Sequence, residues 1–204
     1  LKTIERIARV CYQSEDTMTE DDSCARRMVS ALVKNHHDAM LEHQIITVIF
    51  TTDRGVTHEA VRHRIASFAQ ESTRYVNYSN DKFGNEITVL NIENGIKRDK
   101  KMKNLSQEAV SQIIAEWHSA MEDAERHYMR MIEFGSSPQI ARSVLPHSTK
   151  ATLVVTMNYR SWRHFFELRT PGDAHPQIRD IAIPLLAEFK KKIPIIFDDI
   201  EVKE

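Results

Sequence analysis

Two short apolar runs rich in β-branched residues limit the folds open to this chain. Residues 45–51 read IITVIFT and residues 152–157 read TLVVTM. Uninterrupted runs of this length are typical of buried strands, and we predict that 45–51 is a central strand. The run ITVL at 87–90 is a weaker third candidate. The sequence therefore predicts a small sheet.

Helical periodicity dominates the rest of the chain. A first helix is expected at 20–35, with Thr19 and Asp22 as a variant capping box. The longest is expected over 106–134, where apolar residues recur on one face and Gly135 follows in the position that commonly ends helices. Further helices are expected to begin at Thr57, Pro138, Ser161 and Pro176.

Three local features refine this prediction. The helix beginning at Thr57 would carry EAVRHRIA, so its basic residues would start on a helix and continue into a loop. The lysine-rich segment 94–104 is expected to be a mobile surface loop. Pro184 inside the last helix predicts a kink there. Together the elements predict an α+β fold: a small central sheet flanked by helices, one of them long.

The size of the chain fits one domain over residues 1–204. Its net charge of −1 gives no electrostatic footprint for nucleic acid or an anionic membrane. No apolar run approaches the roughly 20 residues that span a bilayer, and the first residues lack the apolar region of a signal peptide. Cys11 and Cys24 form no C-x-x-C pair, which is typical of a reducing, cytoplasmic compartment.

Residues 62–75, RHRIASFAQESTRY, are unusually dense in groups that bind anions. Three arginines, a histidine, three hydroxyls of Ser and Thr and a tyrosine occur there with one acid, Glu71. Arginine offers a planar fork of donors that matches phosphate or carboxylate. The competing interpretation is a solvated, charged helix surface that runs into a polar loop.

The ten histidines do not form a recognisable metal motif. His58, Glu59 and His63 resemble H-E-x-x-H but contain one residue too many. A spacing of five puts the two rings roughly 140° apart on a helix, against roughly 40° for a spacing of four. We therefore predict no metal site.

Nucleotide binding by a glycine-rich loop is also disfavoured, because none of the five glycines lies in a G-x-G-x-x-G or P-loop motif. Side chains would have to bind the phosphates instead. A second basic cluster supplies them after the run at 152–157. It comprises Asn158, Arg160, Arg163, His164 and Arg169, with Arg142 upstream. Two such clusters, each following a predicted buried strand, favour a polyanion site built from side chains.

These motifs resemble those of the flavin-dependent thymidylate synthases. That family has an Arg-His-Arg followed by a spaced Ser-x-Arg-Tyr, here RHRIASFAQESTRY. LEH at 41–43, ARSVLP at 141–146, NYRSWRHFFELR at 158–169 and His175 match in the same order. The resemblance covers roughly residues 20–190.

The resemblance implies an α+β homotetramer with active sites shared between subunits. It implies FAD as cofactor, NADPH as reductant, and methylation of dUMP with 5,10-methylenetetrahydrofolate, a folate, as carbon donor. FAD would contact Arg62, His63, Arg64, Gln70, Asn158, Arg160 and His164. The substrate would contact Glu59, Arg62, Gln70, Glu71, Ser72, Arg74, Arg142 and Arg169. Arg169 would be catalytic, because a cation beside the uracil ring favours its ionised form.

This chain departs from many family members at three places. Ala39 stands where a Ser or Thr contacts the flavin, Glu59 where a glutamine contacts the substrate, and Ala69–Gln70 where Asn-Glu is usual. Two other functions remain open from the residues alone. One is a non-catalytic nucleotide- or nucleic-acid-binding module that uses the same arginines, and the other is an interaction domain with ion-paired helices.

Overall fold

The sheet has three antiparallel strands in the order β1-β3-β2, with β1 at Ile45–Asp53, β2 at Ala66–Gln70 and β3 at Lys150–Asn158. The computed structural model describes residues 1–203. Every second residue of β3 is buried, as expected for the 152–157 run. The prediction that 45–51 is a central strand was wrong, because β1 forms an edge and exposes Ile45 and Ile49.

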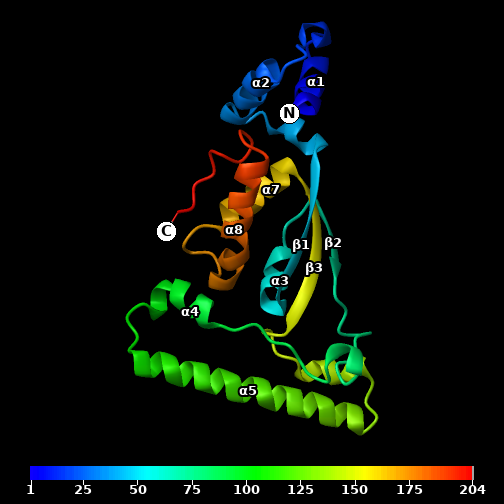
Figure 1. Ribbon diagram of the computed structural model, residues 1–204, viewed down its shortest axis with the longest axis vertical. Helices are drawn as coiled ribbons and strands as arrows, with labels where there is room; N and C mark the ends of the chain where they lie inside the picture. Colours follow the sequence, from blue (N-terminus) through cyan, green and yellow to red (C-terminus); the bar gives the residue numbers. More distant parts are fainter. Residues whose placement is uncertain (204) are drawn as a thin grey trace.

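One face of the sheet is covered by α3 (Arg54–Ala60), α7 (Tyr159–Arg169) and α8 (Pro176–Lys192), as Figure 1 shows. The core between these layers is largely aromatic. Its rings come from Phe50, Trp162, Phe165, Phe166, Phe189 and Phe197. Burying a large apolar side chain stabilises the fold by about 1.5–3 kcal/mol, so this core fixes α7 and α8 against the sheet.

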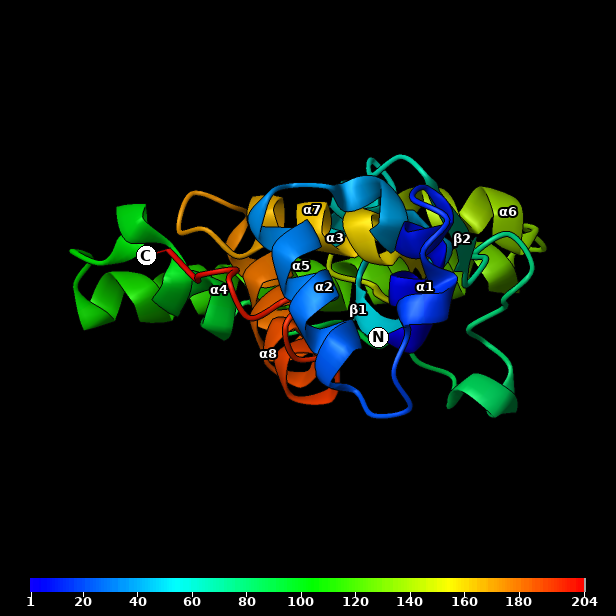
Figure 2. The same ribbon diagram turned by 90° about the horizontal axis from the view of Figure 1, so that it is seen from above.

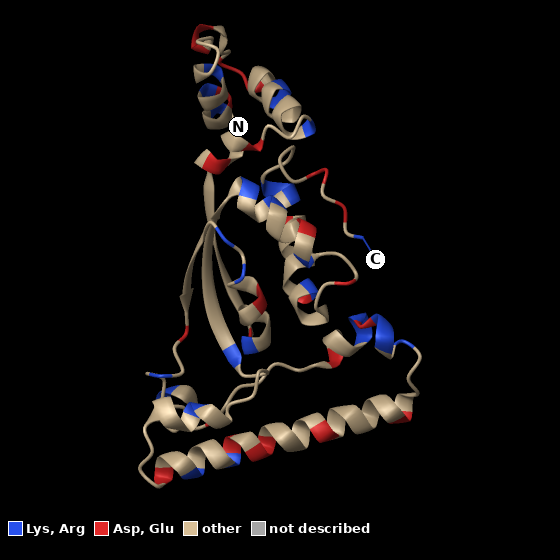
Figure 3. Ribbon diagram, turned by 180° about the vertical axis from the view of Figure 1, so that it is seen from behind, with Lys and Arg blue, Asp and Glu red and all other residues tan. Residues whose placement is uncertain are grey.

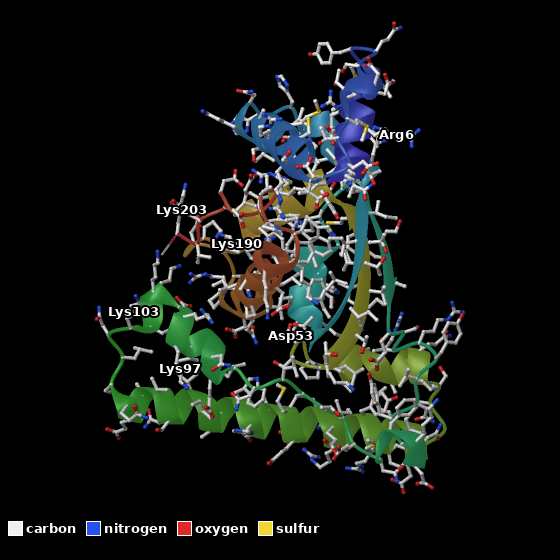
Figure 4. All side chains as sticks on the ribbon, turned by 45° about the horizontal axis from the view of Figure 1, so that its top comes forward. Arg6, Asp53, Lys97, Lys103, Lys190 and Lys203 are labelled. Carbon is white, nitrogen blue, oxygen red and sulfur yellow. The ribbon has the colours of Figure 1, made fainter. Side chains whose placement is uncertain are left out.

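The start of α3 differs from the sequence prediction. Asp53, not Thr57, is its N-cap, and the Asp53 carboxylate accepts a hydrogen bond from the Val56 backbone N–H at 2.7 Å. Figure 4 shows Asp53 at the end of β1 where α3 begins. The helix ends at Ala60, so RHR at 62–64 lies in a turn and not on a helix, and β2 follows where a loop was expected.

The remaining helices surround this centre. They are α1 (Lys2–Val10), α2 (Ser23–Lys34), α4 (Glu93–Arg98), α5 (Gln107–Glu133) and α6 (Pro138–Ala141). Short 3₁₀ turns lie at η1 (Glu15–Thr17), η2 (Asp38–His43), η3 (Asp81–Phe83), η4 (Lys100–Met102) and η5 (Arg142–Val144). Figure 2 shows α4 and the start of α5 projecting beyond the rest of the molecule.

The long helix was predicted correctly. The Ser106 hydroxyl accepts a hydrogen bond from the Ala109 N–H at 3.2 Å, and Gly135 follows the helix at a φ of 91°, which glycine adopts at little cost. The short helix at Pro138 is also confirmed, and Pro184 lies inside α8 as expected. Whether Pro184 kinks α8 stays a prediction.

Four other predictions were wrong. Helix α2 lies within 20–35, but the Thr19 hydroxyl bonds Asp21 instead of forming a capping box with Asp22. The run at 87–90 contributes only an isolated bridge from Val89 to Thr149. The segment 94–104 holds α4 and η4 where a loop was expected, while its mobility stays a prediction. Helix α7 is capped by Asn158, whose side-chain oxygen accepts from the Ser161 N–H, and Ser161 itself lies inside the helix.

Arg98 of α4 forms an ion pair with Asp180 of α8, which holds the lysine-rich segment against the core. Figure 3 shows the basic residues gathered on α4, whereas acidic residues recur along α5. Within residues 1–203, no helix is both long enough and apolar enough to cross a membrane.

Candidate functional site

A cleft of about 610 Å³ lies between the turn before β2 and the exposed side of α7. Arg62–Ile65 line it from the turn, Asp38 and Glu42 from η2, and α7 contributes residues from Arg160 to Arg169. Its volume falls within the range of about 300–1,000 Å³ that is common for ligand pockets. Residues 62–65 of the first basic cluster therefore meet Arg160, Arg163, His164 and Arg169 of the second in one cavity.

The backbone of the turn is strained where it enters β2. Ile65 has a φ of 58°, in the left-handed region, and its side chain is 74% exposed. A β-branched residue in this region costs on the order of 1–3 kcal/mol and is often found at functional sites. The strain redirects the chain between Arg64 and Ala66, so that the Arg-His-Arg segment lines the cleft while β2 pairs with β3.

Arg169, at the end of α7, is held by three acceptors from the α3 end of the cleft. Its Nη1 donates to the Glu59 carboxylate at 2.6 Å and its Nη2 to the Glu59 backbone carbonyl at 3.2 Å. Its Nε donates to Nε2 of His63 at 3.0 Å. The Arg169 side chain is only 16% exposed, so these contacts fix its orientation. Arg169, Glu59 and His63 are referred to below as the arginine clamp.

His63 is neutral near pH 7. Burial, together with the positive charge of Arg169 and the neighbouring His164, lowers the pKa of His63 to about 4. Its ring lies 5.0 Å from that of Phe165 and 6.0 Å from that of His164, centroid to centroid. Because Nε2 accepts from Arg169, the ring proton must lie on Nδ1.

The other arginines of α7 have different partners. Arg160 is exposed and pairs with Glu42 of the LEH motif at 2.5 Å. Arg163 is buried, and its guanidinium forms two bonds with the Asp199 carboxylate, at 2.6 and 2.7 Å, from the C-terminal segment. The side-chain oxygen of Asn158 caps the helix by accepting a hydrogen bond from the Ser161 N–H at 2.8 Å. Arg163 is thus structural, while Arg160 forms an exposed ion pair at the cleft surface.

The residues after β2 form a separate group at the other end of that strand. Here Arg74 donates from Nε to the Gln139 side chain of α6 at 3.1 Å, one turn before Arg142. Ser72 accepts a hydrogen bond from the Arg74 N–H at 3.3 Å. Arg74 and Arg142 are both exposed. Ser72, Arg74 and Arg142 are referred to below as the lower cluster.

Gln70 and Glu71 lie where β2 ends, next to the lower cluster. The Gln70 amide donates to the Thr57 hydroxyl at 3.0 Å. One Glu71 oxygen accepts from the Thr152 N–H at 3.3 Å and the other from the Tyr78 hydroxyl at 3.5 Å. Burial and the negative charge of Glu71 raise the pKa of Tyr78 to about 12. Both side chains therefore brace the end of the sheet.

Strand β2 separates the lower cluster from the cleft. Ala66 pairs with Met157 and Gln70 with Leu153, so the strand runs away from Asn158 and the start of α7. Its five residues span about 17 Å at roughly 3.4 Å each. Figure 1 shows the segment after β2 beside α6 and α5, at the opposite end of the sheet from α1 and α2. One chain alone does not bring all the predicted substrate contacts together.

The structure thus unites Arg62, His63, Arg64, Arg160, His164 and Arg169 in the cleft, with Glu59 and Asn158 beside it. It leaves Gln70, Glu71 and the lower cluster outside it. Sequence reasoning missed Asp38, Glu42, Ile65 and Glu167 as lining residues. Three of these lie in motifs already quoted: Glu42 in LEH, Ile65 in the segment 62–75 and Glu167 in the segment 158–169. No comparable signal marked Asp38. Within residues 1–203, no three His, Cys, Asp or Glu side chains group as they would around a metal ion.

Comparisons with known proteins show to which family the chain belongs. The family described as thymidylate synthase complementing protein matches residues 1–195. A flavin-dependent thymidylate synthase of Corynebacterium aurimucosum is 30% identical over 204 residues, covering 98% of this chain and 79% of that protein. One of Mycobacterium sp. (strain JLS) is 32% identical over 208 residues, with the same two coverages.

A solved structure is similar over nearly the whole chain. It is the UMP/dUMP methylase PolB from Streptomyces cacaoi bound with 5-Br dUMP, at a TM-score of 0.77 and 27% identity. The match covers 96% of this chain and 87% of that one. The α+β arrangement described above is therefore a known fold. With a family match over residues 1–195 and relatives of 30% identity or more, this chain belongs to the thymidylate synthase complementing protein family.

Proposed function

We propose that this chain is a flavin-dependent thymidylate synthase. It would methylate dUMP to dTMP, with 5,10-methylenetetrahydrofolate as carbon donor and NADPH-reduced FAD as hydride source. The observation that carries the proposal is the convergence of Arg62, Arg64, Arg160 and the clamped Arg169 on one cleft in a member of this family. We further propose that the enzyme is cytoplasmic and that its ligands are nucleotides and not nucleic acids.

The cleft suits the chemistry of FAD. A pyrophosphate is a dense anion, and Arg62, Arg64 and Arg160 offer it charged donors where no glycine loop does. A second cavity of about 420 Å³ adjoins the cleft and shares Asp38 and Arg160 with it, which extends the room for a long dinucleotide. When bound, the reduced flavin would supply the hydride, so the protein needs no nucleophile of its own.

Arg169 would act on the uracil ring of dUMP. Its side chain is mostly buried and fixed by Glu59 and His63, which is the preorganisation that electrostatic stabilisation requires. A guanidinium beside the ring favours the ionised form and so makes the ring carbon more nucleophilic. His63, being neutral, orients Arg169 without adding charge to the cleft.

The lower cluster would bind the phosphate and sugar of dUMP in a different copy of the chain. We infer a homotetramer with shared sites because these residues lie beyond β2 from the cleft. Two apolar surfaces support this. Ile45 and Ile49 are 68% and 67% exposed on the open sheet face, and Val110, Ile113 and Trp117 of α5 are only half-buried. Such surfaces commonly mark interfaces.

Two measurements on purified protein test the proposal. The first is an absorbance spectrum, where bound flavin gives a maximum at about 450 nm. The second is NADPH oxidation with and without dUMP, with dTMP identified as product in the presence of methylenetetrahydrofolate. A colourless protein that binds no added FAD and ignores dUMP would refute the proposal. Oligonucleotide binding with a steep salt dependence would favour a nucleic-acid-binding module instead.

A further inference from the structure

Arg169 already has an anionic partner in the free chain. The Glu59 carboxylate lies 2.6 Å from Nη1, and the Glu59 side chain is 35% exposed, so solvent and ligands reach it. The two charges cancel, and the third member of the arginine clamp, His63, adds none because its pKa is about 4. The clamp as a whole is therefore neutral near pH 7.

This neutrality affects ligand binding. A bound anion interacts with the sum of the nearby charges, so the negative charge of Glu59 offsets the attraction of the Arg169 guanidinium. Of the five N–H donors of Arg169, three bind Glu59 and His63, and a donor on each terminal nitrogen is left for a ligand. A ring anion bound there would lie a few ångströms from the Glu59 carboxylate as well. Like charges at that separation repel, and partial burial strengthens the repulsion.

We propose that Glu59 is a counter-ion that limits how strongly Arg169 attracts an ionised pyrimidine ring. The carboxylate and the ring compete for one guanidinium, so Glu59 sets the site's preference between neutral and ionised rings. The inference rests on the proposed function, since it takes a uracil nucleotide as the ligand of Arg169. It makes Glu59 a positioning residue that acts through Arg169.

The substitution Glu59→Gln separates charge from shape. The glutamine oxygen can still accept from Nη1, and two clamp contacts do not involve this side chain at all: the Glu59 backbone carbonyl at 3.2 Å and His63 at 3.0 Å. Arg169 would keep its orientation, and the net charge of the arginine clamp would rise from zero to +1. A purely structural role for Glu59 predicts weaker binding in this variant. A direct contact from the new glutamine predicts tighter binding without greater ionisation of the ring. The counter-ion role predicts both tighter binding and greater ionisation.

The test uses FAD-loaded enzyme and 5-bromo-dUMP, whose electron-withdrawing bromine makes the ring easier to ionise. Calorimetric titration should show about tenfold tighter binding to Glu59→Gln than to wild type, equivalent to about 1.4 kcal/mol. Ultraviolet difference spectra at a fixed pH should show a larger ionised fraction of the bound ring. Glu59→Asp, which keeps the charge, should show neither gain.

Glu167→Gln is the matched control. Glu167 also lines the cleft and loses one negative charge in this variant. Among residues 1–203 its carboxylate has a contact with His164 at 3.9 Å, and its side chain is 53% exposed. Solvent screens such a charge, so we expect less than about a twofold change in affinity. Thermal melts of all variants verify the fold, and Glu59→Ala repeats the charge removal should Glu59→Gln misfold.

The outcomes separate the three hypotheses. Tighter binding and greater ring ionisation in Glu59→Gln, absent in Glu167→Gln, support the counter-ion role. If wild type binds 5-bromo-dUMP and the neutral Glu59 variants bind it equally or more weakly, or more tightly without greater ring ionisation, the counter-ion role is wrong and the proposed function stands. If wild type binds neither dUMP nor 5-bromo-dUMP, the counter-ion role and the proposed function are both wrong.

Discussion

The two groups of arginines differ in how the fold holds them. Arg169 is 16% exposed and makes three hydrogen bonds within the chain, two of them to Glu59. Arg74, beyond β2, is exposed and makes one side-chain hydrogen bond, to Gln139, with its guanidinium 5.2 Å from the ring of Tyr75. A charge taken out of water needs a partner, whereas an exposed arginine gains little from one.

This difference separates a prebuilt site from one that a ligand or another copy must complete. The end of α7 is supported from behind, because the fully buried Arg179 donates to the Thr170 carbonyl at 3.0 Å. Arg169 is therefore fixed before any substrate arrives. Among residues 1–203 the lower cluster has no comparable support, and phosphate is the kind of ligand that would order it.

The largest expected effect tests whether the two groups serve one active site. We expect Arg169→Ala to lower dTMP formation by about 10³-fold through loss of electrostatic stabilisation, with little change in thermal stability. Arg74→Ala should weaken dUMP affinity by roughly ten- to hundredfold, since a hydrogen bond to a charged group contributes about 1.5–3 kcal/mol. Turnover and calorimetric titration measure the two effects.

Co-assembly of these two variants sharpens the comparison. If each site takes Arg169 from one copy and Arg74 from another, random mixing leaves about a quarter of the sites intact. Co-expressed Arg169→Ala and Arg74→Ala chains should then recover about that share of wild-type activity at limiting dUMP. No recovery in verified mixed oligomers would mean that the two arginines act within one chain or in separate sites.

A smaller effect concerns pH and the neutral His63. Its pKa falls from an ordinary 6.5 to about 4 in the folded chain, so below about pH 6.5 the unfolded chain binds a proton that the folded chain does not. Stability should therefore fall as the pH drops from about 6.5 to about 4, with His63 contributing about 3 kcal/mol of that loss.

His63→Gln isolates this contribution, because glutamine can still accept from Arg169 Nε but does not titrate. Urea unfolding at several pH values should give a shallower loss of stability in this variant. Equal slopes in both proteins would show that His63 is protonated in the folded state or does not control acid stability. No such pH dependence is expected from replacing an exposed residue of the lower cluster.

The smallest effect tests whether Asn158 serves as a cap or as a flavin contact. Asn158→Ala removes the hydrogen bond to the Ser161 N–H and should cost about 1 kcal/mol of stability, as other N-cap losses do. Asn158→Asp keeps the accepting oxygen and should retain most of the stability. Reduced FAD retention in Asn158→Asp at normal stability would identify an amide contact with the flavin; unchanged retention would leave only the cap.

Much of the candidate site could be read from the sequence, because its residues lie in two short motifs. Arg62–Arg64 and Arg160–Arg169 were assigned to one site, and the cleft brings them together. The pairing of Glu59 with Arg169 was not foreseen. It joins positions 110 residues apart, and the sequence gives no rule for such a contact.

The errors in predicting the fold share a physical origin. Apolar and polar residues alternate only weakly at 66–70. The sequence therefore suggested that the helix expected from Thr57 runs through the arginines into a loop. Pairing with Met157 to Leu153 of β3 makes them a strand instead. Likewise, the apolar run at 45–51 has the composition of a central strand, but strand order decides burial, and β1 pairs with one neighbour only.

The sequence by itself determined the local chemistry: the long helix with its Ser106 cap, the strand at 152–157, and two segments whose side chains can bind anions without a glycine loop. These follow from periodicity, capping and donor geometry, which act over a few residues. Only the tertiary structure decided that Glu59 neutralises Arg169 and that β2 separates the lower cluster from the cleft. Charge pairing and strand order depend on which distant segments pack together, and local preference does not encode that.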